Sequence, residues 1–221
     1  GLGELPGPGG PAFPDSWRVC YLTRARGRRL VRNAFNPEET KAAIVEAIRA
    51  EAARRGRGAA AVAVADITPT SRHTFEDQVR MFAACDLLAS PHGSQNANAI
   101  FMRPGALFLE INPPKFFYFS YEAMCRASGL HYVPSRRNTA LHATRQPKLQ
   151  AKFARRVRTY AKLNDTECQD VFDCQDAARW TAYDVNTSDL RAQLGRVLRY
   201  LGVPDDACRR EAECAAVRRG P

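Results

Sequence analysis

Residues 75–113 of the 221-residue chain read FEDQVRMFAACDLLASPHGSQNANAIFMRPGALFLEINP. The stretch predicts helices and strands that alternate along the chain, over residues 75–84, 86–90, 95–101 and 106–111. The two strands are apolar runs without polar alternation, a pattern typical of parallel strands covered on both faces. The stretch therefore predicts the centre of a parallel sheet with helices packed against it.

The same alternation continues on both sides of this stretch. It predicts buried strands over residues 17–23, 60–66 and 131–133, and helices over residues 37–55 and 118–128. Asn36 and Thr74 are expected to cap the helices that follow them, because their side-chain oxygens can accept from the first backbone N–H groups. The expected fold class is α/β, a Rossmann-like parallel sheet flanked by helices.

Composition divides the chain into three expected parts. Residues 1–16 are rich in Gly and Pro and predict a flexible linker, and residues 17–145 form the Rossmann-like core. Residues 146–221 predict a helical, cysteine-containing C-terminal extension that packs on the core. The chain begins without an initiator Met or a signal-peptide pattern, so we expect a piece of a longer protein with any membrane anchor upstream.

The chain is basic, with 33 Lys and Arg against 23 Asp and Glu and a formal net charge of +10 at pH 7. Nearly all of the basic residues are Arg, and Arg and Ala both have GC-rich codons. Two explanations stay open: genomic composition, or attraction to a polyanion such as nucleic acid or the diphosphate of a nucleotide sugar. The sequence shows no RNA-recognition, homeodomain or zinc-finger pattern, so we do not expect a nucleic-acid partner.

The seven cysteines fall into two groups. Three lie in apolar segments and are expected to be small core residues: Cys20, Cys85 and Cys125. Four form two spaced pairs in polar sequence, as disulfides of an oxidising compartment do: Cys168 with Cys174, and Cys208 with Cys214. A zinc site is the alternative, but the C-x2-C spacing is absent.

Two N-glycosylation sequons flank the first of these cysteine pairs. They are Asn164-Asp165-Thr166 and Asn186-Thr187-Ser188. Each occurs often by chance, but together with the paired cysteines they favour a lumenal protein.

Three loops that leave predicted strand ends carry the candidate binding residues. The first is the basic loop 24–29, in which Arg24 and Arg28 are candidate phosphate ligands; a solvated basic loop is the alternative. The second is the turn 90–98, where a glycine opens a helix N-terminus suited to an anion; its candidate ligands are Gly93, Ser94, Gln95, Asn96 and Asn98. The third is residues 110–114 at the end of the fourth strand, where Glu110 is a candidate for hydrogen bonds to ribose hydroxyls or else the partner of an arginine.

These loops predict a pocket for a negatively charged nucleotide. The sequence has neither a G-x-G-x-x-G after its first strand nor a G-x-x-x-x-G-K-[ST] loop. A dinucleotide dehydrogenase or a P-loop ATPase is therefore disfavoured.

The quoted stretch resembles the signature block of glycosyltransferase family 61 (the DUF563 type), which reads approximately F-x-E-Q-V, H-G-A-G-L-T-N, a Pro-Gly turn and E-I-x-P. The positions that match this frame are Phe75, Gln78, Val79, His92, Gly93, Asn98, Pro104, Gly105, Glu110, Ile111 and Pro113. The resemblance extends more weakly over residues 17–201. One departure is clear: residues 94–97 read SQNA where the family has A-G-L-T, which bears on sugar preference and on activity.

The resemblance implies the donor-binding, C-terminal half of a GT-B glycosyltransferase, with an acceptor-binding domain upstream. It implies transfer of a sugar from a UDP-sugar to a glycan or glycoprotein hydroxyl, with inversion, in the lumen of the Golgi or endoplasmic reticulum.

His92 is the candidate catalytic base or phosphate contact, or else holds its turn by a hydrogen bond. We expect this piece alone to be inactive. No metal ligands are assigned and metal dependence stays open. The alternative function is a non-catalytic glycan-binding or interaction domain with the same fold.

Overall fold

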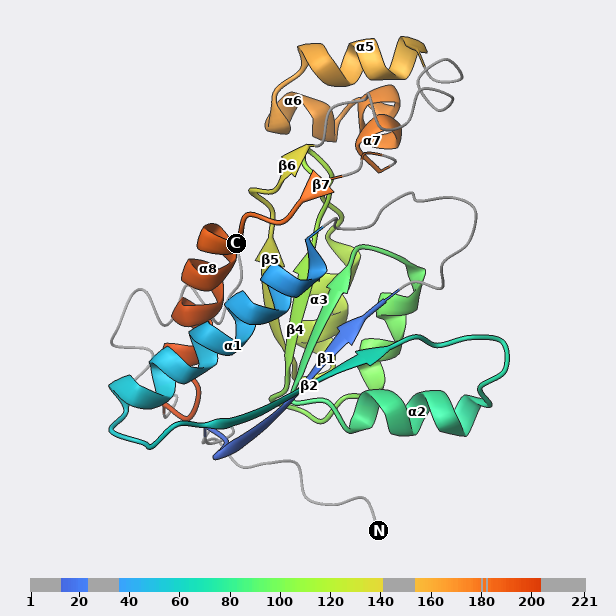
Figure 1. Ribbon diagram of the computed structural model, residues 1–221. Coiled ribbons are helices and arrows are strands. Elements are labelled where there is room, and N and C mark those ends of the chain that lie inside the picture. Colours follow the sequence, from blue (N-terminus) through green and yellow to red (C-terminus); the bar gives the residue numbers. More distant parts are fainter. Residues whose placement is uncertain (1–12, 24–35, 141–153, 180, 182, 204–221) are drawn as a thin grey trace.

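A five-stranded parallel sheet forms the centre of the protein in the computed structural model (Figure 1). The structure describes residues 13–23, 36–140, 154–179, 181 and 183–203. The strands lie in the order β2-β1-β3-β4-β5, with bounds β1 (Ser16–Leu22), β2 (Ala61–Ile67), β3 (Leu87–Pro91), β4 (Leu107–Ile111) and β5 (His131–Ser135). The expected α/β fold with a parallel sheet is confirmed.

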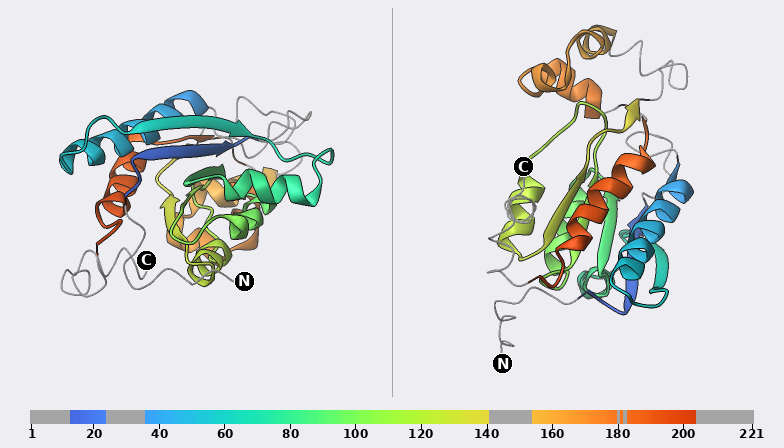
Figure 2. Two further views of the ribbon diagram at one scale, coloured as in Figure 1. Left: turned by 90° about the horizontal axis from the view of Figure 1, so that it is seen from below. Right: turned by 90° about the vertical axis from the view of Figure 1, so that its left-hand side faces the viewer.

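Helices cover both faces of this sheet (Figure 2). On one face lie α1 (Pro37–Arg54) and α8 (Thr187–Arg199), whose apolar side chains share a core with alternate strand residues such as Val19 and Leu109. On the other face lie α2 (Phe75–Ala83), the 3-10 helix η1 (Ser94–Phe101) and α3 (Ser120–Ala127). These pack on the remaining strand residues, among them Leu88 and Phe108. Strands β3 and β4 are buried along their whole length because helices cover both of their faces in this way.

The two predicted helix caps differ in outcome. Thr74 caps α2 as expected: its side chain accepts from the backbone N–H of Asp77, whose carboxylate accepts in return from the N–H of Thr74. Asn36 precedes α1 but does not cap it. Its side chain instead donates to the carbonyl of Val185 at 3.0 Å and accepts from the N–H of Val185 at 2.8 Å. Asn36 thus ties the start of α1 to the chain leading into α8.

Strand β2 corrects one expectation. The apolar run over residues 60–66 predicts a buried strand, but most residues of β2 are exposed, and Val64 is 38% exposed. Among the described residues the strand is at the edge of the sheet and pairs with β1 alone, and the helices cover the inner strands more fully. An apolar composition does not reveal a strand's place in the sheet.

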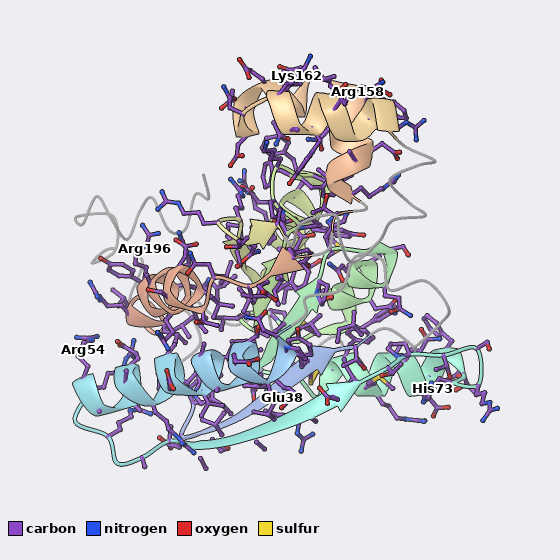
Figure 3. The ribbon with its side chains drawn as sticks, turned by 45° about the horizontal axis from the view of Figure 1, so that its top comes forward. Glu38, Arg54, His73, Arg158, Lys162 and Arg196 are labelled. Atoms are coloured by element: carbon purple, nitrogen blue, oxygen red, sulfur yellow. A yellow bond between two sulfur atoms is a disulfide. The ribbon has the colours of Figure 1, made fainter. Side chains whose placement is uncertain are left out.

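A helical group lies beyond the carboxyl ends of the strands, at the top of Figure 1. It contains α5 (Ala154–Lys162), α6 (Asp165–Gln169) and α7 (Phe172–Arg179), next to a two-stranded ribbon of β6 (Thr139–Ala140) and β7 (Tyr183–Asp184). Arg158 and Lys162 point outward from α5 (Figure 3). The ribbon and the two short helices were not predicted, because elements of two to eight residues carry too little periodicity.

Lys115 attaches the helical group to the sheet. This residue lies in the loop after β4, and its ammonium donates to the carbonyls of Tyr160 at 2.9 Å and Leu163 at 2.7 Å. The side chains of Gln169 and Gln175 donate to the carbonyl of Lys115 in return. The strand-end loop and the helices therefore hold one another in place.

The disulfides confirm one cysteine expectation and correct another. Cys168 and Cys174 are bonded, as their spacing predicts. Cys20 and Cys85, expected to be separate core thiols, are also bonded, because β1 and the end of α2 bring their Cα atoms to 5.7 Å. Cys125 is a buried thiol as expected. The expected pair Cys208 and Cys214 lies outside the described residues.

Candidate functional site

The candidate site lies at the carboxyl edge of the sheet, where β1 and β3 are neighbours. The chain runs from β1 outward to β2 and then returns to β3 on the other side of β1. Ligands of open α/β sheets bind at such a reversal of strand order. Arg24 and Arg28, the predicted phosphate ligands of the first loop, lie outside the described residues.

A chain of three polar side chains occupies this edge. Nδ1 of His92, just after β3, lies 2.6 Å from Oε1 of Glu110 in β4. The hydroxyl of Tyr132, in β5, donates to the other oxygen, Oε2. The His92 side chain is 11% exposed and that of Glu110 is 0% exposed. The carboxylate therefore lies beneath the imidazole and reaches a ligand only through it, whereas the sequence predicts direct contact with a ribose.

The strand register explains why these residues converge. In a strand, alternate side chains share a face, so Ser90 and His92 point the same way, as do Phe108 and Glu110. Phe108 is the partner of Tyr132 across β4 and β5, which places that tyrosine on the same face. This is the face covered by η1 and α3.

The protonation pattern of the chain follows from its burial. Burial and the negative charge of Glu110 raise the pKa of Tyr132, so its hydroxyl keeps its proton and donates. A carboxylate only accepts, so the Nδ1 of His92 carries the proton in this pair. The lone pair of the neutral imidazole is then on Nε2.

Aromatic rings surround the imidazole. The ring centroids of Phe116, Tyr121 and Tyr118 lie 4.6, 5.4 and 6.5 Å from that of His92. Tyr118 is 58% exposed, and Phe119 beside it is 65% exposed. The site therefore has an apolar wall next to a titratable nitrogen, and part of that wall faces solvent.

The turn after His92 leads into η1. Gly93 has an extended backbone, φ 175° and ψ 166°, and its carbonyl accepts from the hydroxyl of Tyr121 at 2.8 Å. No side chain among the described residues caps η1, which begins just after β3 at the carboxyl edge of the sheet. Ser94 is exposed at this end. The expected helix is present, but as a 3-10 helix.

The other predicted residues of the turn hold the loop to its surroundings. Gln95 donates to the carbonyl of Pro69 at 3.1 Å, and Asn98 donates to the side chain of Gln78 at 3.3 Å. Asn96 is fully buried and its Oδ1 accepts from the hydroxyl of Ser90. The Nδ2 of Asn96 is buried without a hydrogen-bond partner among the described residues.

Arg136 is a cation at this edge that the motifs did not reveal. It follows β5 directly, and its guanidinium carbon lies 3.4 Å from the ring centroid of Phe117. Burial lowers its pKa, although an arginine stays protonated near neutral pH. Its Nε and Nη2 have no hydrogen-bond partner among the described residues. Its position directly after the fifth strand could have identified it as a candidate ligand. In a chain this rich in Arg, however, one more arginine at a strand end does not stand out.

Among the described residues, no group of three His, Cys, Asp or Glu side chains could hold a metal ion. Two hollows of about 670 and 640 Å³ share Trp17, Asp86 and Arg103 in their linings. These residues mark the amino ends of the strands, the edge opposite His92.

A family model described as Glycosyltransferase 61 matches residues 11–109. The match runs from β1 into β4, includes the turn at His92 and Gly93, and ends one residue before Glu110. A search of curated proteins finds no match. The family match confirms the resemblance expected from the motifs.

Proposed function

We propose that the protein transfers a sugar from a UDP-sugar to a hydroxyl of a glycan or glycoprotein, and the match of residues 11–109 to the Glycosyltransferase 61 family model supports this. The observation that carries the proposal is the chain of His92, Glu110 and Tyr132 at the carboxyl edge of the sheet. A structural histidine needs no buried carboxylate beneath it. A carboxylate in this position suits a general base, because it fixes the tautomer of the imidazole and stabilises its protonated form.

The diphosphate of the donor would bind between η1 and β5. The uncapped N–H groups that begin η1 and the hydroxyl of Ser94 are donors for its oxygens. The guanidinium of Arg136 adds a positive charge held flat against Phe117. Arg24 and Arg28, in the loop after β1, are proposed as further phosphate ligands. Phosphate oxygens suit guanidinium groups because two parallel N–H bonds can form at once.

The sugar and the acceptor would lie against the aromatic wall. The exposed ring of Tyr118 offers a flat apolar surface within reach of the imidazole. In the reaction, Nε2 of His92 takes the proton of the acceptor hydroxyl as its oxygen attacks the anomeric carbon. The bond from that carbon to the diphosphate breaks on the opposite face, which inverts the configuration. Glu110 stabilises the imidazolium that forms, and Arg136 stabilises the charge on the departing UDP.

The compartment follows from the covalent structure. Disulfides persist in oxidising compartments, and the described residues contain two of them. This supports a lumenal or secretory protein, and we propose the Golgi or endoplasmic reticulum. Among the described residues, no helix is long and apolar enough to cross a membrane.

A thermal-shift panel tests the binding part of this proposal. We expect UDP and UDP-sugars to raise Tm by a few degrees at millimolar concentration, because ligand that binds only the folded state stabilises it by RT ln(1 + [L]/Kd). ADP, GDP and CMP at the same concentration serve as controls for nucleotide class. No shift with any uridine nucleotide contradicts the proposal, and binding of glycans without donor binding favours the alternative, a non-catalytic glycan-binding domain.

A further inference from the structure

Two exposed asparagines, Asn164 and Asn186, begin the N-x-[ST] sequons of this chain. Such a sequon is the acceptor for N-linked glycosylation when it lies on the surface of a protein in the secretory pathway. Neither middle position is Pro, which would disqualify the motif. The residues at the third position, Thr166 and Ser188, are exposed as well. Both motifs are therefore on the surface and not in the core.

The two asparagines have the same side-chain arrangement. Oδ1 of Asn164 accepts from the N–H of Glu167 at 2.9 Å, and Oδ1 of Asn186 accepts from the N–H of Asp189 at 3.0 Å. With the oxygen turned toward the chain, Nδ2 is turned away from it. A glycan is attached through Nδ2 and leaves the amide oxygen in place. The modification is therefore compatible with the capping bond that each asparagine makes.

The disulfides supply an independent argument for the compartment. Cys168–Cys174 begins four residues after Asn164, and Cys20–Cys85 lies within the sheet core. Disulfides form in the endoplasmic reticulum lumen and other oxidising compartments. The lumen that oxidises these cysteines also holds the enzyme that reads N-x-[ST] sequons, so the same entry step exposes the chain to both reactions.

We propose that Asn164 and Asn186 both carry N-linked glycans. In the reaction, Nδ2 forms a bond to the anomeric carbon of the first sugar of an oligosaccharide linked to a lipid pyrophosphate. The bond from that carbon to the pyrophosphate breaks, the lipid pyrophosphate leaves as the anion, and Nδ2 gives up one proton. The modification depends on the lumenal location of the chain and not on its own transferase activity.

The test is expression of the full chain behind a secretory signal in cultured mammalian cells, followed by mass spectrometry before and after treatment with an N-glycosidase in heavy-oxygen water. We expect the wild type to lose the mass of two glycans. The N-glycosidase converts each glycosylated asparagine, at positions 164 and 186, to an aspartate that carries heavy oxygen. The aspartate keeps an oxygen that can cap its helix.

Matched variants separate glycosylation from folding. Thr166→Ala and Ser188→Ala remove one sequon each while keeping the capping asparagine, and we expect each to lose one glycan. Thr166→Ser and Ser188→Thr keep the motif, and we expect both glycans in each. Secreted protein with an intact Cys168–Cys174 disulfide but no glycosidase-sensitive mass overturns the proposal. A glycan at one asparagine alone overturns it for the other.

Discussion

Glu110 is a fully buried carboxylate whose two oxygens are engaged by His92 and Tyr132. Burying a charge is costly unless hydrogen bonds compensate it, so a sequence retains such a group where it has a task. Here the task is to orient His92 and to stabilise its protonated form. Glu110 is therefore a positioning residue, and His92 is the group proposed to touch the substrate.

Glu110→Gln tests this assignment. Gln keeps the size of the side chain but removes the charge, and an amide nitrogen facing His92 would favour the other tautomer. Measured in the full-length protein, kcat for UDP release from the donor should fall roughly 10²–10⁴-fold, the usual contribution of a general base. UDP affinity should change little, because Glu110 does not face the ligand.

Tyr132→Phe is the matched control for this experiment. It removes one hydrogen bond to the same carboxylate and keeps the charge, so we expect a loss on the order of 10-fold. Wild-type turnover in Glu110→Gln would contradict the assignment of His92 as the base.

The sequence predicts some of these residues for identifiable reasons. His92 and Glu110 end apolar strands, and strand ends meet at one edge of a parallel sheet. Tyr132 was missed because its place opposite Phe108 depends on the register of β4 and β5, which the local pattern does not encode. Arg136 was missed because it is one arginine among many.

At the scale of elements, the loop after β4 links the site to the helical group. Lys115 lies three residues beyond the buried Asn112 and bonds two carbonyls at the end of α5. Helix ends leave carbonyls without partners, and a lysine ammonium satisfies them well.

Lys115→Met should loosen the helical group selectively. Loss of hydrogen bonds from a charged group costs about 1.5–3 kcal/mol, so we expect faster amide hydrogen exchange over residues 154–179 and little change in α1. Lys162→Met, on the outward side of α5 (Figure 3), is the control and should leave exchange unaltered. Equal effects of the two variants would show that Lys115 does not anchor the group.

The elements with strong periodicity or strong boundary residues were predicted within a few residues. The helix after Thr74 is an example, because a capping box defines its start. The exposure of β2 was not predictable, since an apolar run reads alike in a central and in an edge strand. The sequence after His92 predicts a helix, but not that this helix has 3-10 geometry.

At the scale of the molecule, Cys20–Cys85 joins β1 to the loop before β3, 65 residues away in sequence. In the chain-entropy model a loop of that size stabilises the fold by about 4 kcal/mol, and the six-residue separation of Cys168 and Cys174 by about 2 kcal/mol.

We compare two double variants, Cys20→Ala/Cys85→Ala and Cys168→Ala/Cys174→Ala. The first should lower the free energy of unfolding more than the second. Urea titration of the two double variants measures the difference. A smaller loss for Cys20→Ala/Cys85→Ala would show that this disulfide does not constrain the unfolded chain as proposed.

Calorimetric titration with UDP tests the central claim, that the carboxyl edge of the sheet binds the nucleotide diphosphate. We expect saturable binding to the wild type and at least a 10-fold higher Kd for Arg136→Ala, since a charge-assisted bond to phosphate is worth about 1.5–3 kcal/mol. Arg103→Ala, at the opposite edge of the sheet, is the matched control and should bind as the wild type does. Absence of UDP binding at millimolar concentration, or an equal loss in both variants, would contradict the account.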